Sequence, residues 1–342
     1  LLCYPKILHL KKFIYTAVNK NKKEVTMSEL RKDYFLDRWV IISEKRGKRP
    51  NLNETKEKKP IKKIDKKCFF CPGNESLTPK EVYVVKKNNR WLIRVVNNPF
   101  PAVDTKKTIA KRLHNPLLIK DKAYGYHEVI IDSNIHNKNL EDFPKEHIKL
   151  LFETFINRIK EISKDKKIKY VGIFKNHKKE AGASIPHSHC QLISYNHFPE
   201  EIKEEINISK KHKSCTFCKL TRLESKSSRL CYKNNSFIAI SPFASQYAYE
   251  ILFIPRRHAS SIMELNQKEL IDLAAILKKA LLKLKKLNAP YNLYFHNFRK
   301  NKKHHFHLKI TPRINTFGGF ELETGTVINT IFPEKAAKFY KK

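Results

Sequence analysis

The sequence predicts an α+β fold made of two tandem units, each a mainly antiparallel sheet with one long helix packed on it. Short apolar runs typical of strands recur in both halves, and each half holds one long amphipathic helix. An internal repeat also places the same residue types in the same order twice. With 342 residues and 41% hydrophobic residues, the chain can bury the core that such a fold needs.

Strands are expected where β-branched and aromatic residues cluster between turn-forming residues. In the first half these runs are 34–42, 82–85, 91–96, 128–132 and 170–174, and in the second half they are 250–254 and 291–295.

Helices are expected over residues 145–163 and 267–287, because each segment repeats apolar residues with the helical period. Pro144 stands at the start of the first helix, where its missing N–H costs nothing. The apolar faces are Ile148, Leu151, Phe152, Phe155, Ile159 and Ile162, and Leu270, Leu273, Ala274, Leu277, Leu281 and Leu284.

The repeat runs Cys-x-x-Cys, strand, His, helix, strand and His-x-His in each half. Glu128 precedes His136 by eight positions, and Glu250 precedes His258 by the same number. Matched order and spacing predict a first unit over residues 27–200 and a second over 201–342. Residues 1–26 contain no Met, Ser or Arg, and we interpret them as an upstream extension that is not native; a targeting presequence is the alternative.

The formal charge of +37 fits either a polyanion binder or compositional bias. Abundant Lys, Asn, Ile, Phe and Tyr with only 8 Gly, and lysines spread along the chain, favour bias and make nucleic-acid binding the weaker interpretation. The odd count of seven cysteines, four of them in two Cys-x-x-Cys pairs, favours metal-bound thiolates in a reduced cytoplasmic setting. No stretch is apolar and long enough to span a membrane.

Two zinc sites are predicted, because zinc prefers four Cys or His ligands in a tetrahedron and the repeat supplies that set twice. The alternative is that these are packed thiols and surface histidines. His127, His177, His212 and His304 have no repeat support, and His296 is intermediate. The proposed sets are Cys68, Cys71, His136 and His187, and Cys215, Cys218, His258 and His305.

The segment His187-Ser-His-Cys-Gln191 places two imidazoles and an amide on one face if it is extended. A neutral His189 could attack an α-phosphorus, and Gln191 could donate to a phosphate oxygen. The competing interpretation is that His189 is a further metal ligand. In the second half, Phe306 and Lys309 replace Ser188 and Gln191, so that half is expected to keep metal without a second nucleophile.

These motifs resemble the galactose-1-phosphate uridylyltransferase family, a duplicated branch of the histidine-triad superfamily. The resemblance is carried by DRWVIISEKRGKRP, CFFCPGNE, RVVNNPFPA, FKNHKKEAGASIPHSHCQ, PFASQYAYEILFIPRRH, HHFHLKITPR and GGFELETG. It implies ping-pong transfer through His189 between UDP-glucose and a hexose 1-phosphate, in a homodimer. It also implies substrate contacts from Arg46, Arg49, Asn98, Asn176, Ser184, Gln191 and Glu321, the last across the dimer.

Two departures keep a second function open. Ser188 and Cys190 stand where well-known bacterial members have Pro and Gly. The His-Ser-His form and the second Cys₂His₂ set look like the ADP-glucose phosphorylases, which transfer adenylate and use phosphate as acceptor. The alternatives are therefore an adenylyltransferase with the same histidine, or a zinc-stabilised nucleic-acid-binding protein.

Overall fold

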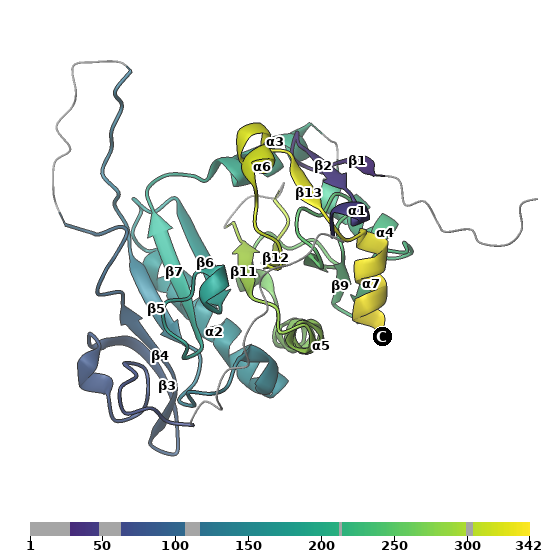
Figure 1. Cartoon of the computed structure of the whole chain (residues 1–342). Coiled ribbons are helices and arrows are strands. Elements are labelled where there is room, and N and C mark those ends of the chain that lie inside the picture. Colours follow the sequence, from purple (N-terminus) through teal and green to yellow (C-terminus); the bar gives the residue numbers. More distant parts are fainter. Residues whose placement is uncertain (1–27, 48–62, 107–116, 212–213, 299–303) are drawn as a thin grey trace, which may run out of the picture.

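The computed structural model of the chain describes residues 28–47, 63–106, 117–211, 214–298 and 304–342 (Figure 1). The predicted N-terminal extension and Arg49 lie outside the described residues. No helix in the described ranges is both long and apolar enough to cross a lipid bilayer.

One ten-stranded antiparallel sheet forms the centre of the molecule, with five strands from each half. The halves meet where β6 pairs with β11, and the strand order then mirrors itself outward on both sides. In sheet order the strands are β3 (Glu81–Lys87), β4 (Arg90–Asn97), β5 (His127–Ile131), β7 (His189–Tyr195), β6 (Tyr170–His177), β11 (Tyr291–His296), β12 (His307–Pro312), β10 (Ile251–Pro255), β9 (Phe237–Ile240) and β8 (Leu230–Lys233). This arrangement confirms the predicted α+β class.

Helices α2 (Lys145–Ile162) and α5 (Gln267–Lys286) pack against each other and bury their apolar faces with the sheet in one continuous core. Each fully buried Leu, Ile or Phe contributes roughly 1.5–3 kcal/mol of hydrophobic free energy. Asn266 fixes the start of α5, since its side chain accepts from the backbone N–H of Glu269 at 2.9 Å. Cys190 and Leu192 of β7 point into this core, so His189 and Gln191 face the other side of the sheet.

A second sheet of three short strands joins the two ends of the chain. It contains β1 (Glu29–Lys32), β2 (Trp39–Ile42) and β13 (Val327–Asn329), with β2 in the middle. The strand predicted over 34–42 is therefore too long. The carboxylate of Asp33 accepts from the backbone N–H groups of Phe35 and Leu36 and forms a turn before β2.

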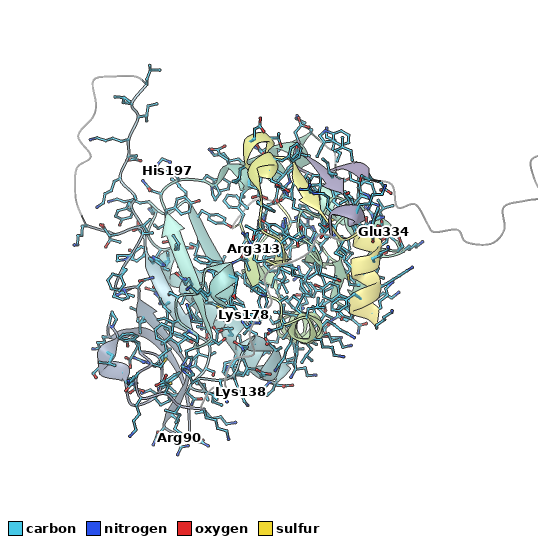
Figure 2. All side chains as sticks on the ribbon, in the orientation of Figure 1. Arg90, Lys138, Lys178, His197, Arg313 and Glu334 are labelled. Carbon is cyan, nitrogen blue, oxygen red and sulfur yellow. The ribbon has the colours of Figure 1, made fainter. Side chains whose placement is uncertain are left out.

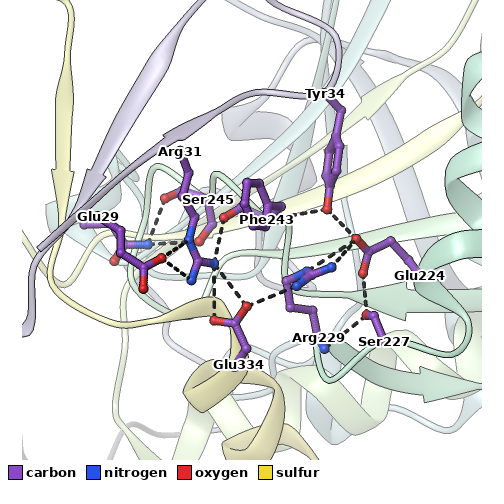
Figure 3. Close-up of polar contacts among 10 residues, drawn as sticks. Glu29, Arg31, Tyr34, Glu224, Ser227, Arg229, Phe243, Ser245 and Glu334 are labelled. Carbon is purple, nitrogen blue, oxygen red and sulfur yellow. Dashed lines mark hydrogen bonds and ion pairs between the residues drawn. The ribbon is translucent and has the colours of Figure 1, made fainter. Parts of the chain in front are cut away.

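Partly buried ion pairs attach this N-terminal segment to the second half (Figure 3). Arg31 and Arg229 both contact Glu334 at 3.1 Å, and Arg229 also pairs with Glu224 at 2.8 Å. The hydroxyl of Tyr34, in the N-terminal segment, donates to the carboxylate of Glu224. Residues from both predicted units thus share one polar network.

The remaining helices are short and lie at the ends of strands. They are α1 (Glu44–Gly47), α3 (Glu200–Lys210), α4 (Thr216–Glu224), α6 (Gly319–Thr324) and α7 (Pro333–Lys341), with 3₁₀ turns at Glu75–Leu77, Leu140–Asp142, Lys179–Ala181 and Ile262–Glu264.

Basic side chains are dispersed over the surface. Figure 2 shows Arg90, Lys138 and Arg313 at separate places on the molecule.

Candidate active site and metal-binding sets

The first predicted metal set comes together on the side of the sheet that faces away from α2. Cys68 and Cys71 lie in the loop before β3, His136 follows β5, and His187 immediately precedes β7. Their ligand atoms all lie within 4.8 Å of one another, and all four residues are buried. Cys71 Sγ is 3.3 Å from His136 Nδ1 and 3.7 Å from His187 Nδ1. A tetrahedral zinc ion would separate sulfur and nitrogen ligands by about 3.6 Å, so this set fits zinc.

The tautomer of His187 is fixed for metal binding through Nδ1. Its Nε2 donates to the backbone carbonyl of Ser133 at 2.8 Å, which leaves the lone pair on Nδ1. Burial lowers the pKa of His187 to about 4 and raises the pKa of Cys68 to about 11. Because burial disfavours the free thiolate, a bound cation would offset that cost.

The second predicted set is built in the same way. Cys215 and Cys218 lie at the start of α4, His258 follows β10, and His305 precedes β12. Both thiols contact His305 Nδ1 at 3.5 Å, and Cys218 is 3.6 Å from His258 Nδ1. His305 Nε2 donates to the carbonyl of Pro255 at 3.2 Å, as His187 does to Ser133. Three members of this set are half-buried, which makes it more open than the first.

His189 presents one unprotonated ring nitrogen to the site. Its Nδ1 donates to the carbonyl of His187 at 2.8 Å, so Nε2 carries the lone pair in the neutral ring. Burial and then the nearby charge of Lys175 lower the pKa of His189, which keeps the ring neutral at pH 7. The ring of Phe70 packs edge-on against the ring of His189, with 5.3 Å between the ring centroids, and limits the rotation of His189. This arrangement is suited to nucleophilic attack by Nε2.

A buried charge network lies behind His189. The ammonium of Lys175 contacts Asp132 at 2.7 Å, the hydroxyl of Ser188 at 2.8 Å and the carbonyl of His189 at 3.0 Å. Burial alone would raise the pKa of Asp132, but Lys175 and Ser188 together bring it below its usual value. Ser188, one of the departures from the family pattern, therefore has a specific polar role here.

Gln191 and Asn98 meet at a histidine that the sequence reasoning missed. His127 Nε2 lies 2.9 Å from Gln191 Oε1 and 3.0 Å from Asn98 Nδ2. The second half has no histidine at the position equivalent to His127, so the internal repeat gives no signal for this residue. Strand alternation could have found it, since His127, Val129 and Ile131 share the face of β5 that lies beside His189 and Gln191 of β7.

Asn176 and the turn that contains Ser184 lie at the junction of the two halves. Asn292 of β11 donates to Asn176 Oδ1 at 2.9 Å and to the carbonyl of Ala181 at 2.8 Å. Gly182 has a φ of +90°, a conformation that favours glycine, and its carbonyl accepts from Asn176 at 3.3 Å. Ser184 is exposed in the turn leading to His187. The second half thus supports a loop of the first-half site.

The structure does not bring Arg46 and Glu321 to His189 within one chain. Arg46 is exposed on α1, and Glu321 lies on α6, where its carboxylate accepts from the backbone N–H of Gly318 at 2.9 Å. Figure 1 shows α1 and α6 on the second-half side of the molecule, apart from β7. Both belong to segments that adjoin the three-stranded sheet.

The chain is similar to known proteins over most of its length. The profile "Galactose-1-phosphate uridyl transferase, N-terminal domain" matches residues 18–199, and a domain of unknown function, DUF4921, matches residues 132–338. ADP-glucose phosphorylase from Arabidopsis thaliana is 32% identical over 332 residues, covering 92% of each chain. Galactose-1-phosphate uridylyltransferase from Thermotoga maritima is 29% identical over 330 residues, covering 91% of this chain and 97% of the relative.

A solved structure extends the likeness to the fold. The crystal structure of an ADP-glucose phosphorylase from Arabidopsis thaliana with bound ADP-glucose has a TM-score of 0.78 and 30% identity, covering 92% of this chain and 99% of that chain. Relatives of both kinds are nucleotidyltransferases, and this chain is an enzyme of that class. The chain belongs to the galactose-1-phosphate uridylyltransferase family.

Proposed function

We propose that the enzyme transfers a nucleotidyl group by way of a covalent bond to His189. The observation that carries the proposal is the hydrogen bond from His189 Nδ1 to the carbonyl of His187, which leaves Nε2 unprotonated in the neutral ring, on the sheet face that Gln191 shares. Nε2 attacks the α-phosphorus of a nucleoside diphosphate sugar, the bond to the sugar 1-phosphate oxygen breaks, and sugar 1-phosphate leaves. A second phosphate acceptor then takes the nucleotide and regenerates His189.

Zinc is the metal that the two Cys₂His₂ sets would hold. It would stabilise the loops that carry His187 and His305 without taking part in the transfer, since a four-protein-ligand site has no open position. In the first set it would fix His187, whose carbonyl in turn orients His189.

UDP-glucose is the first candidate donor, with a hexose 1-phosphate such as galactose 1-phosphate as acceptor. Support comes from the family and from the full-length likeness to the Thermotoga maritima enzyme. ADP-glucose, with phosphate as acceptor, is the second candidate. The His-Ser-His motif, the second Cys₂His₂ set and the 32% identity to ADP-glucose phosphorylase favour it.

A homodimer would complete the site. Arg46 and Glu321 lie apart from His189 in one chain, and the three-stranded sheet of a neighbouring subunit could supply both. Mixing His189→Ala and Glu321→Ala subunits tests this arrangement, because a heterodimer would contain one complete site. Recovered transfer supports it, whereas two inactive parents that exchange subunits without recovery contradict it.

The central experiment is intact mass measurement after separate incubation with UDP-glucose and ADP-glucose. Neutral or basic conditions are needed, because the phosphorus–nitrogen bond is labile in acid. A uridylyl adduct supports the first donor and an adenylyl adduct the second. His189→Ala should form neither adduct, and the exposed His197→Ala should form the wild-type adduct. Metal-loaded wild-type enzyme that forms no adduct with either donor would contradict the proposal.

A further inference from the structure

His127 of β5 is held by contacts from two segments, the loop after β4 and strand β7. Its Nδ1 accepts from the backbone N–H of Ala102 at 3.1 Å, and its Nε2 faces Gln191 Oε1 and Asn98 Nδ2. The side chain is buried, with 9% of the residue exposed. A buried histidine of this kind can simply join a loop to a strand, so its contacts alone do not define a role in the reaction.

The direction of its hydrogen bonds fixes how His127 meets Gln191. A backbone N–H cannot be turned round, so Ala102 requires the lone pair on Nδ1 and places the hydrogen of the neutral ring on Nε2. That hydrogen is donated to Gln191 Oε1 at 2.9 Å. The carbonyl end of the Gln191 amide is therefore fixed at His127, and its NH₂ end remains for another acceptor.

Asn98 is set in a similar way. Its Oδ1 accepts from the backbone N–H of Phe100 at 2.9 Å, so its NH₂ faces His127 Nε2, which has no lone pair to offer. The hydrogens of Asn98 Nδ2 are thus also available to an incoming acceptor. His127 thus orients the Gln191 amide, and the backbone of Phe100 orients the Asn98 amide. Both NH₂ groups are available as donors on the His189 side of the sheet.

The internal repeat gives independent support. In the sheet register, the positions equivalent to His127 and Gln191 are Glu250 and Lys309, which lie 3.9 Å apart on the same face as the buried His307. The two residues are replaced as a pair. The histidine that contacts Gln191 is therefore present only in the half that keeps Gln191.

We propose that His127 is a positioning residue for nucleotidyl transfer, which fixes the Gln191 amide so that its NH₂ donates to a non-bridging oxygen of the α-phosphate. The inference rests on the proposed function of His189. Preorganised donors of this kind act where negative charge develops, so a freely rotating Gln191 would stabilise that charge less well.

The test is the single-turnover rate of adduct formation, with the donor that labels wild-type enzyme. His127→Phe keeps the size of the ring and removes its hydrogen bonds. We expect the rate to fall about 10- to 100-fold, below the ~10²–10³-fold seen when an oxyanion donor itself is removed. The KM for the donor should change by less than about threefold, because the contact matters mainly in the transition state.

Two further variants separate positioning from stability. His127→Gln can still donate to Gln191 Oε1 and should recover most of the rate, whereas the shorter His127→Asn should resemble His127→Phe. In a Gln191→Ala background, His127→Phe should add almost nothing, because the amide that it orients is gone. His197→Phe, an exposed histidine, is the matched control and should keep the wild-type rate.

Folded His127→Phe or His127→Asn enzyme with the wild-type rate would overturn the inference. A rate loss from His127→Phe that is as large in the Gln191→Ala background as in the wild-type background would also overturn it. If His127→Phe does not fold, His127→Asn and His127→Gln carry the same comparison. Failure of the proposed function is distinguishable, since wild-type enzyme would then form no adduct at all.

Discussion

The two halves hold equivalent histidines in opposite surroundings. His189 and His307 each donate through Nδ1 to the carbonyl two residues earlier, at 2.8 and 3.0 Å. Behind His189 lies the cation of Lys175, whereas in the sheet register the equivalent position in the second half is Phe295, whose ring stacks on that of Phe306. The same backbone geometry thus carries a different side-chain network in each half.

The space in front of the two rings also differs. Phe217 stacks on His307 at 4.7 Å, and Glu205 Oε1 lies 3.8 Å from His307 Nε2. The cavity beside His307 measures about 20 Å³, which is room for roughly one water and not for a nucleotide. The second half therefore keeps the strand order and the Cys₂His₂ grouping of the first half, but it leaves no room for a substrate beside His307.

The largest expected effect separates the two histidines. His189→Ala should lower nucleotidyl transfer by at least about 10⁴-fold, the scale seen when a covalent nucleophile is removed. His307→Gln should leave the rate within about threefold, but lower the free energy of unfolding by about 1–3 kcal/mol, because it disturbs a buried hydrogen-bonded group. Adduct formation and urea unfolding measure the two quantities. Equal loss of transfer in both variants would contradict the functional division of the halves.

The first metal set should matter more for the transfer rate than the second. Cys68→Ser should lose the metal of its own set and about 10- to 100-fold in transfer, because His187 and the backbone that orients His189 lose their anchor. Cys215→Ser should lose the other metal and lower the melting temperature, with a smaller loss of transfer. Metal content per chain, melting temperature and transfer rate are measured on the same samples. A Cys215→Ser enzyme as slow as Cys68→Ser would show that the second set also serves the reaction.

The buried Lys175–Asp132 pair should be the most costly ion pair to break. Lys175→Met leaves Asp132 buried without its cation and should cost about 3–5 kcal/mol in the free energy of unfolding. Adding Asp132→Asn should recover much of that loss without recovering transfer. Lys309→Met is the matched control, because Lys309 is also buried but lies 3.9 Å from Glu250. Urea unfolding that shows the same loss for both lysine variants would contradict this ranking.

Sequence patterns could predict the elements that repeat. The two long helices, most of the strands and both Cys₂His₂ groupings follow from periodicity and from the duplicated order of Cys and His. The pairing of β2 with β13 could not be predicted, because it joins opposite ends of the chain and has no local signal. His127 and Asn292 were missed for a related reason, since each acts across a strand pairing that only the folded sheet defines.

The smallest expected effect tests whether the second half serves the first-half site. Asn292→Ala removes two hydrogen bonds, to Asn176 Oδ1 and to the carbonyl of Ala181. Each such bond contributes about 1 kcal/mol, and since the loop can be partly re-solvated, we expect the KM for the donor to rise roughly fivefold with little change in kcat. Asn235→Ala, an exposed asparagine of the same half, should leave both constants unchanged. If Asn292→Ala leaves the KM unchanged, the second half supports the sheet alone, and the turn that contains Ser184 is held by first-half residues.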